Sequence, residues 1–265
     1  MNIFLRELKA NRKALIIWCA CMFALVGIGM LKYAGFSQSG EAVNELMNSM
    51  PNAVKAMFGI GLVNLTEVRG YYSIFFLYFI LIGTVHASML GANIISKEEK
   101  DKTAEFLMAK PATRNKIVTS KLAAAVVNIL ILNVTTLISS IIFVGHYSNG
   151  ETINNVILKL MLAMFILQLI YMAIGTAIAA ISKNSKISTS IATVILMFTF
   201  ILSMAIDMNN KLEKLKYITP FKYFDGKNLV FGNGFDEIFL ILSSIIFVVL
   251  ILVTYSFYSK RDLNI

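Results

Sequence analysis

Six apolar segments, each long enough to cross a membrane, constrain the fold of this chain more than any other feature of its sequence. They run roughly over 14–34, 71–95, 118–144, 157–181, 187–206 and 237–258, and each is nearly free of charge. A helix crosses the hydrocarbon core with about 20 residues. Lipid offers no partner for unpaired backbone groups, so each span must be helical. The sequence therefore predicts an all-α polytopic membrane protein with six transmembrane helices and a single transmembrane domain over 1–265.

Composition excludes several other classes of protein. Of the 265 residues, 57% are apolar and only 15% are charged, whereas a typical soluble domain is about 25% charged. The two cysteines, Cys19 and Cys21, lie in the first apolar segment, so we interpret them as buried thiols and not as a disulfide scaffold. No small-x-small cleavage site closely follows that segment, so we expect it to be a permanent span and not a signal peptide.

Lysine and arginine are distributed unevenly between the two sides of the predicted membrane. Fourteen of them fall in the N-terminal tail, in the loops after the second and fourth spans, and at the C-terminal end. Loop 35–70 has only Lys55 and Arg69, and loop 145–156 has none. Basic residues favour the cytoplasmic side, so both termini are predicted to be cytoplasmic. Loop 207–236 disagrees, because it carries five lysines although six spans place it outside.

The net charge of +9 is explained by this topology. Basic tails and loops on the cytoplasmic side meet anionic lipid. We therefore expect these basic residues to bind membrane lipid and not a nucleic acid. Residues 1–13 are basic and amphipathic, with Phe4, Leu5 and Leu8 at helical spacing. They are predicted to form an interfacial helix that turns into the first span, although ordinary positive-inside anchoring explains them equally well.

Two loops are expected to contain short helices. In loop 35–70 apolar residues recur every three or four positions, and Pro51 predicts a break between two helices. In loop 96–117, Ser96 and Glu99 match a capping box, and Glu98 and Lys102 are spaced for a helical ion pair. These features predict a cytoplasmic helix over about 96–110. A solvated charged loop is the alternative, because so short a helix must pack on something.

The sequence contains no recognisable catalytic machinery. It lacks a glycine-rich phosphate loop, so ATP is not expected to bind this chain in the usual way. His86 and His146 lie in different segments without a partner at metal-ligand spacing. An intramembrane glutamate protease would need its glutamate pair inside the bilayer, whereas Glu98 and Glu99 lie in a charged loop. We therefore expect a protein that is not an enzyme and holds no metal or cofactor.

Polar and small residues inside the spans mark helix contacts or a pathway. In lipid, polar side chains usually face the interior of a bundle. The candidates are His86, Asn93, Asn128, Asn133 and Gln168. Gly83, Ala87 and Gly91 recur every four positions, which predicts a close approach of the second span to another helix.

Two segments carry a family resemblance. The first comprises Glu98, Thr103, Glu105, Leu107, Pro111, Arg114, Ile117, Val118 and Lys121, and the second comprises Thr219, Pro220, Phe221, Lys222, Tyr223, Phe224 and Asp225. They resemble the Glu…Thr-x-Glu-x-Leu…Pro-x-x-Arg…Lys signature and the Pro-Phe-x-Tyr-Phe segment of type-2 ATP-binding-cassette (ABC) transporter permeases. The resemblance covers essentially the whole chain. Lys102 stands where many members have glycine, and helix propensity favours lysine there.

The resemblance implies a mechanism with partners. A separate ATPase subunit, which binds ATP and Mg, would dock on the cytoplasmic face, and helix 96–110 would be the coupling helix seated in it. Glu98, Glu99 and Glu105 would pair with basic groups of the ATPase, and Phe106 and Leu107 would fill an apolar notch. Thr103, Pro111 and Arg114 belong to the same coupling segment. A second permease copy or a paralogue would complete the pathway.

The leading hypothesis is therefore the permease subunit of an ABC exporter in a bacterial cell membrane, acting on a hydrophobic or amphiphilic peptide, drug or lipid. The alternative is a non-transporting membrane sensor or immunity module on the same scaffold. A neighbouring gene for a Walker-type ATPase would favour the exporter.

Overall fold

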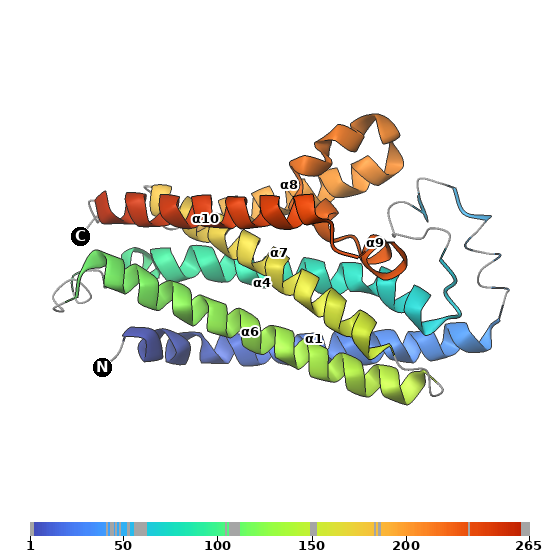
Figure 1. Ribbon diagram of the computed structural model, residues 1–265. Helices are drawn as coiled ribbons and strands as arrows, with labels where there is room; N and C mark the ends of the chain where they lie inside the picture. The colour runs from blue at the N-terminus through green and yellow to red at the C-terminus, as the bar shows by residue number, and fades with distance from the viewer. Residues whose placement is uncertain are drawn as a thin grey trace.

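The structure is a computed structural model in which every regular element of the described chain is a helix (Figure 1). The residues described are 3–40, 42, 45, 47, 49–51, 54–55, 63–103, 105, 112–148, 153–182, 184, 187–232 and 234–260. The long helices are α1 (Ile3–Gln38), α4 (Val68–Lys100), α6 (Arg114–Tyr147), α7 (Asn154–Ile181), α8 (Ser188–Met208) and α10 (Glu237–Lys260). Three short elements precede α10: η1 (Asn210–Tyr217), η2 (Pro220–Phe224) and α9 (Gly226–Phe231).

The prediction of six transmembrane helices is confirmed. All six long helices are apolar and long enough to cross a membrane, and each contains one of the predicted apolar segments, except that α8 begins one residue after the start of 187–206. Three of them extend well beyond those segments. At about 1.5 Å per residue, the 36 residues of α1 span about 54 Å, whereas the hydrocarbon core is about 30 Å thick. The ends of α1, α4 and α6 therefore project beyond it.

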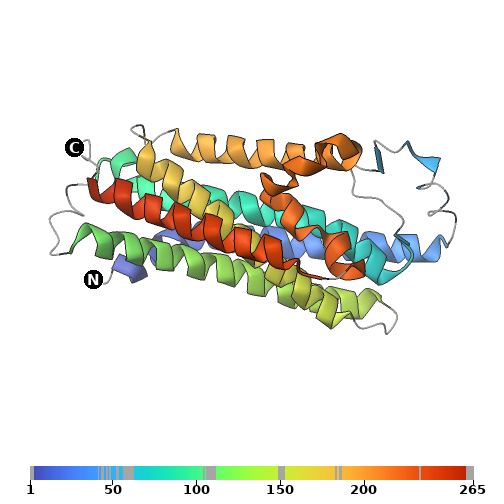
Figure 2. The same cartoon turned by 45° about the horizontal axis from the view of Figure 1, so that its top comes forward.

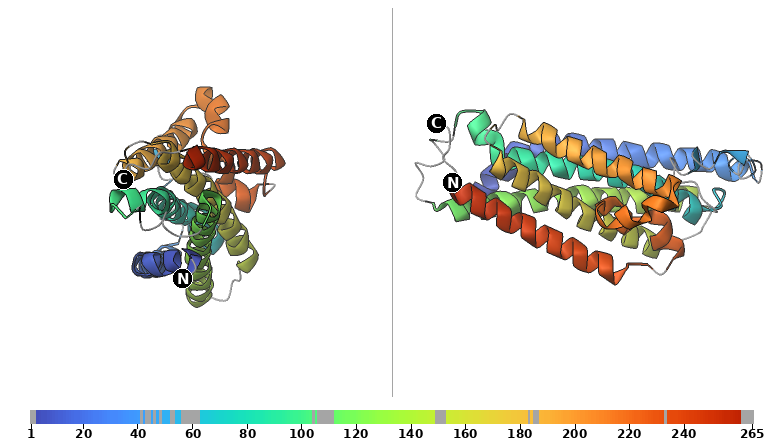
Figure 3. Two further views of the ribbon diagram at one scale, coloured as in Figure 1. Left: turned by 90° about the vertical axis from the view of Figure 1, so that its left-hand side faces the viewer. Right: turned by 90° about the horizontal axis from the view of Figure 1, so that it is seen from above.

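The six helices form a bundle around α4 and α7, which pack extensively on each other. α7 runs obliquely between α4 and α10, and α1 packs mainly on α6 (Figures 1 and 3). α1 begins and α10 ends at the same end of the bundle, here called the terminal end, where α4 also ends and α6 begins. η1, η2 and α9 lie at the opposite, far end (Figure 2). The chain thus crosses the bundle six times, so segment 207–236 lies opposite the termini.

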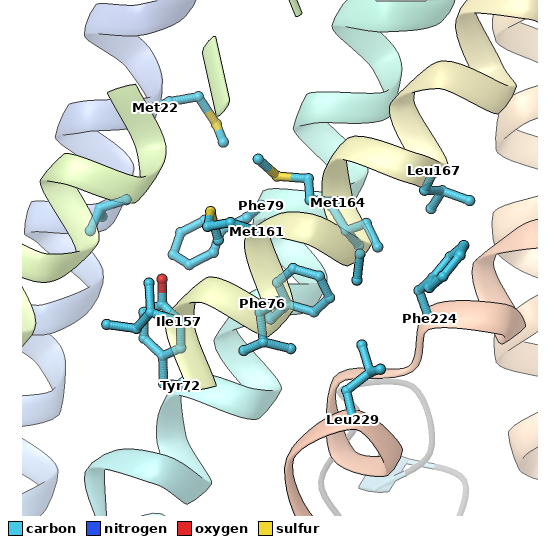
Figure 4. Packing of buried hydrophobic residues seen from close by; sticks show 14 of the residues in the cluster. Met22, Tyr72, Phe76, Phe79, Ile157, Met161, Met164, Leu167, Phe224 and Leu229 are labelled. Atoms are coloured by element: carbon cyan, nitrogen blue, oxygen red, sulfur yellow. The ribbon is translucent and has the colours of Figure 1, made fainter. Parts of the chain in front are cut away.

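The hydrophobic core lies mainly between α4 and α7 (Figure 4). Tyr72, Phe76 and Phe79 of α4 face Met161 and Met164 of α7, and all five are almost completely buried. Bulky side chains here interdigitate at the density of an organic crystal. This core lies toward the far end of the bundle, whereas the charged and polar residues described below lie mainly toward the terminal end.

Small residues bring α4 and α7 into backbone contact, as the spacing of Gly83, Ala87 and Gly91 predicted. A Cβ added at Gly91 would lie 2.3 Å from the carbonyl oxygen of Met172, and one at Gly175 would lie 2.4 Å from that of Ser88. No real Cβ tolerates such distances. The prediction of a close helix approach is therefore confirmed, with α7 as the partner.

The predicted N-terminal interfacial helix is not a separate element. Residues 3–13 are the first turns of α1 and not a distinct interfacial helix, because Arg6 and Glu7 are held against the bundle by charged partners on α4. In loop 35–70, residues 42, 45, 47, 49, 54 and 55 are helical and Met50 is a bend, but much of that loop lies outside the described residues, so the two helices stay a prediction.

The helix predicted over 96–110 does not begin at Ser96. Residues 96–100 are the last turn of α4, and the Ser96 hydroxyl donates back to the Ala92 carbonyl at 2.8 Å instead of capping a new helix. Such a bond is typical of a serine inside a helix. Glu98 and Glu99 consequently lie at the negative, C-terminal end of a helix, and Glu98 pairs with residues other than Lys102. The capping-box interpretation was therefore wrong.

Candidate functional site

Five charged side chains from three helices meet at the terminal end, and we call them the terminal charge cluster. They are Arg6 and Glu7 of α1, Lys97 and Glu98 of α4, and Lys121 of α6. The Arg6 guanidinium donates to Glu98 at 2.9 Å and to Glu7 at 3.1 Å. Lys97 donates to Glu7, and Lys121 donates to Glu98 at 2.5 Å. The cluster therefore links the start of α1, the end of α4 and the start of α6.

Three of the five charges are buried, which makes their pairing obligatory. Glu7 and Lys121 have no exposed surface, and Glu98 is 6% exposed. Lys121 also donates to the Ile94 carbonyl at 2.5 Å. Removing a charge from water costs several kcal/mol unless partners compensate it. All three cations and both anions take part in ion pairs. The cluster therefore fixes the positions of the three helices relative to one another.

The end of α4 connects this cluster to the segment between α4 and α6 through a Schellman motif. The Thr103 amide donates to the Glu98 carbonyl at 2.7 Å, and the Lys102 amide donates to the Glu99 carbonyl at 3.2 Å. This pattern requires a left-handed residue after the cap, and Lys102 has φ 54°. The left-handed region favours glycine, so the helix-propensity reason for lysine at this position was wrong. Glu98 thus belongs to both the charge cluster and the turn.

The residues expected to contact an ATPase differ in their exposure and in their contacts. Glu98 faces inward to Arg6 and Lys121, so its carboxylate does not face outward as predicted. Glu99 lies in the last turn of α4, whereas Thr103 and Glu105 are exposed. Arg114 opens α6 and donates to the Ser259 carbonyl near the end of α10 at 2.9 Å. The predictions for Phe106, Leu107 and Pro111 fall outside the described residues.

The five polar residues predicted inside the spans fall into two groups. Asn133 donates to Gln168 in the packed interior, so these two residues join α6 to α7. His86, Asn93 and Asn128 instead line one cavity of about 410 Å³ toward the terminal end. The His86 ring lies edge-on to Trp18, with ring centroids 5.3 Å apart. One group therefore makes a helix contact and the other lines an open space.

The second resemblance segment, 219–225, closes the far end of the bundle. Phe221 packs against Tyr171 and Phe200 with ring centroids 5.1 and 5.2 Å away, and Tyr223 stacks on Phe239 at 4.8 Å. Burial raises the pKa of the Tyr223 hydroxyl to about 12. The segment thus ties α7, α8 and α10 together through aromatic contacts.

Charges at the far end are also paired. Lys222 binds Asp207 and lies 3.6 Å from Asp225. Burial lowers the pKa of the nearby Lys227 ammonium, although the Asp225 carboxylate opposes this shift. Two of the five lysines that disagreed with the predicted orientation, Lys216 and Lys222, therefore pair with local carboxylates.

Sequence reasoning did not assign Glu7, Lys97 and Lys121 as members of a buried network. One signal was present: Lys121 lies inside the apolar run 118–144, and a lysine there requires a carboxylate or carbonyl partner. The identity of that partner was not readable, because Glu98 lies 23 positions away on another helix, and Arg6, which shares Glu98, lies 92 positions before it.

Comparison with known proteins gives one finding for the whole chain. A family model described as "ABC-2 family transporter protein" matches residues 1–263. A search of curated proteins returns no match.

Proposed function

Because the chain belongs to the ABC-2 family of transporter proteins, we propose that it is the permease subunit of an ABC exporter. The family makes it a membrane transport component that is not itself catalytic. In this proposal a separate ATPase subunit binds ATP and Mg and docks at the terminal end. The cargo is a hydrophobic or amphiphilic molecule, and the host membrane is the bacterial plasma membrane.

The observation that carries this proposal is the position of the terminal charge cluster. Glu98 pairs with Arg6 of α1 and Lys121 of α6, and its own carbonyl accepts the Thr103 amide. A displacement of the segment after Lys102 therefore acts on three spans at once. ATP binding can shift the spans between two states only through contacts that differ between those states. Through the terminal charge cluster, a movement of the coupling segment would be transmitted to the three spans.

The proposed ATPase contact is limited to the exposed part of the coupling segment. Glu98 is already neutralised within the chain, so Glu105, which is helical and exposed, is the carboxylate we assign to a basic group of the ATPase. Phe106 and Leu107 are the apolar residues that follow it in the sequence. Glu98 instead has a positioning role, because it fixes the base from which this segment projects.

The proposal also includes a second permease subunit, as the family resemblance implies. Large apolar side chains are exposed along α8 and α10, including Val194, Phe198, Ile241 and Leu252. Lipid and the second subunit, a copy or a paralogue, would cover these surfaces.

The direct test is co-purification with an ATPase encoded beside this chain. Glu105→Lys combined with Phe106→Ala should abolish co-purification or uncouple ATP hydrolysis from the permease, while the variant still inserts and remains folded. Glu213→Lys is the matched control, since Glu213 is an exposed carboxylate at the far end, and it should retain the partner. Undiminished ATPase binding and coupling in the Glu105 variant would refute the docking surface.

A further inference from the structure

A lateral groove opens between α1 and α8 at the terminal end, with α4 and α6 forming its floor. Its volume is about 410 Å³, which lies within the range of about 300–1,000 Å³ usual for small-molecule sites. Figure 3 (left) shows α4 between α1 and α8 at this end. The lining residues that matter are Trp18 of α1, His86, Met89, Asn93 and Lys100 of α4, and Asn128 of α6.

Polar residues follow the length of the groove. His86, Asn93 and Lys100 are spaced by seven positions on α4, which places them on one face of the helix. At about 1.5 Å per residue, the fourteen positions from His86 to Lys100 correspond to about 21 Å. Met89 and Trp18 add apolar surface beside this polar row. The groove therefore matches an elongated molecule with both apolar and polar parts.

Two of these polar side chains have an atom or group without a hydrogen-bond partner in the part of the chain that the structure describes. His86 is 4% exposed, yet its Nδ1 atom has no hydrogen-bond partner among the described residues. Asn93 is partly exposed within a span and forms no hydrogen bond within the described ranges. Leaving a polar group unpaired in an apolar environment costs about 1–3 kcal/mol by mutational measures. A ligand that bonds to the partly exposed Asn93 amide would remove its share of this cost, and a plain acyl chain would not.

The charge of the groove selects among such ligands. Lys100 is exposed, and no carboxylate is among the groove's lining residues. A cationic ligand would meet only a like charge there, whereas an anionic group would be attracted to the ammonium.

We propose that the lateral groove binds a drug-sized amphiphile that is anionic or neutral, not cationic. Its anionic group lies near Lys100, its hydrogen-bonding groups reach Asn93 and His86, and its apolar body contacts Trp18 and Met89. The identification of this amphiphile as the transported cargo rests on the function proposed above, but the binding itself does not.

The chain supplies its own reporter, because Trp18 is its single tryptophan. The purified permease in lipid nanodiscs is titrated with stearate that carries a nitroxide on its chain, and with the same labelled chain bearing a trimethylammonium head. We expect saturable quenching of Trp18 fluorescence, with half-saturation at an about tenfold lower concentration for the carboxylate probe. That ratio corresponds to about 1.4 kcal/mol, which is within reach of one charge-assisted hydrogen bond.

Variants of the lining residues test whether the quenching of Trp18 arises from binding in the groove. Lys100→Gln should remove the preference for the carboxylate head, and Asn93→Leu with His86→Phe should raise half-saturation about tenfold for both probes. Ser244→Leu on α10 is the control, since Ser244 is exposed on another helix, and it should change neither quantity. Circular dichroism and size-exclusion elution verify that each variant remains folded.

Three results would overturn the proposal. Equal, non-saturable quenching by both probes would mean that Trp18 meets only bulk lipid. Protection of Trp18 from both probes, with cross-linking between copies of a Trp18→Cys variant, would assign the groove to a second subunit. Variants that leave both half-saturation values unchanged would also reject it. Co-purification of the unaltered chain with the ATPase is scored separately, and absence of that partner contradicts the proposed function and not the groove.

Discussion

At the scale of single residues, Lys121 is the clearest case of a side chain whose partner determines its position. It is fully buried and holds Glu98 at 2.5 Å. We expect Glu98→Gln to destabilise the protein by about 3–5 kcal/mol, because a buried ammonium would lose its counter-charge. The thermal midpoint of the detergent-solubilised protein, measured by fluorescence-detected chromatography, should fall by about 10 °C.

Two further variants test whether the loss comes from the unpaired charge. Glu213→Gln removes an exposed partner of Lys216 and should change stability by less than about 0.5 kcal/mol. The double variant Glu98→Leu with Lys121→Met removes both charges and should recover a large part of the loss. A double variant as unstable as Glu98→Gln would argue against this account.

Lys102 carries a backbone cost that can be relieved. Its φ of 54° lies in the left-handed region, which costs a residue with a side chain about 1–2 kcal/mol. Glycine avoids this cost but loses part of the gain through the entropy of the unfolded chain. We expect Lys102→Gly to stabilise the protein by about 0.5–1 kcal/mol, which raises the thermal midpoint by about 1–3 °C. Lys102→Ala, which keeps the strain, should not raise it.

At the scale of elements, the contact between α4 and α7 depends on glycines at their crossing. Gly91→Ala places a Cβ 2.3 Å from the Met172 carbonyl oxygen, so the two backbones must separate. We expect a loss of about 1–3 kcal/mol, seen as a lower thermal midpoint and a lower yield of folded protein. Gly145→Ala in α6 is the matched control, because no atom lies within 4 Å of its added Cβ. It should be neutral or gain up to about 1 kcal/mol.

The spans were predictable from the sequence because lipid imposes a length and a composition on each of them. The helix ends were not. Ser96 is polar and residues 97–100 are charged, so hydropathy ended the second span at 95, whereas the backbone bonds of α4 continue to Lys100. The Ser96 and Glu99 pair then fitted a capping box by chance. A local pattern describes which bonds are available, but the ion pairs with α1 and α6 decide which ones form.

The candidate site was predictable only in part, for a related reason. The periodic and family patterns identified Glu98 and the coupling segment, yet they assigned Glu98 to an external partner. Its internal partners come from helices whose packing no local pattern encodes. Similarly, His86, Asn93 and Asn128 were identified as polar residues in spans, but only the packing of four helices brings them to one cavity.

At the scale of the whole molecule, the six crossings place segment 207–236 and segment 101–103 at opposite ends (Figure 1). We expect Lys214→Cys, made in a chain with Cys19 and Cys21 replaced by alanine, to react with a membrane-impermeant maleimide on intact cells. Lys102→Cys should react only after permeabilisation, because the termini are predicted to be cytoplasmic. Both positions are exposed. Labelling of both from one side would contradict six crossings, and reversed labelling would invert the orientation.

The terminal charge cluster also imposes an order on the synthesis of this protein. Arg6 is made 92 residues before Glu98, and Lys121 follows later still. At about 5–20 residues per second, Arg6 and Glu7 therefore wait about 5–20 seconds, while two spans enter the membrane, before their partners exist. In a nascent chain that lacks Lys121, Glu98 has Arg6 of α1 but not its second partner on α6. The joint that would receive the ATPase is thus completed only once the start of the third span, which carries Lys121, has been made, so a ribosome-bound fragment that ends earlier cannot present it.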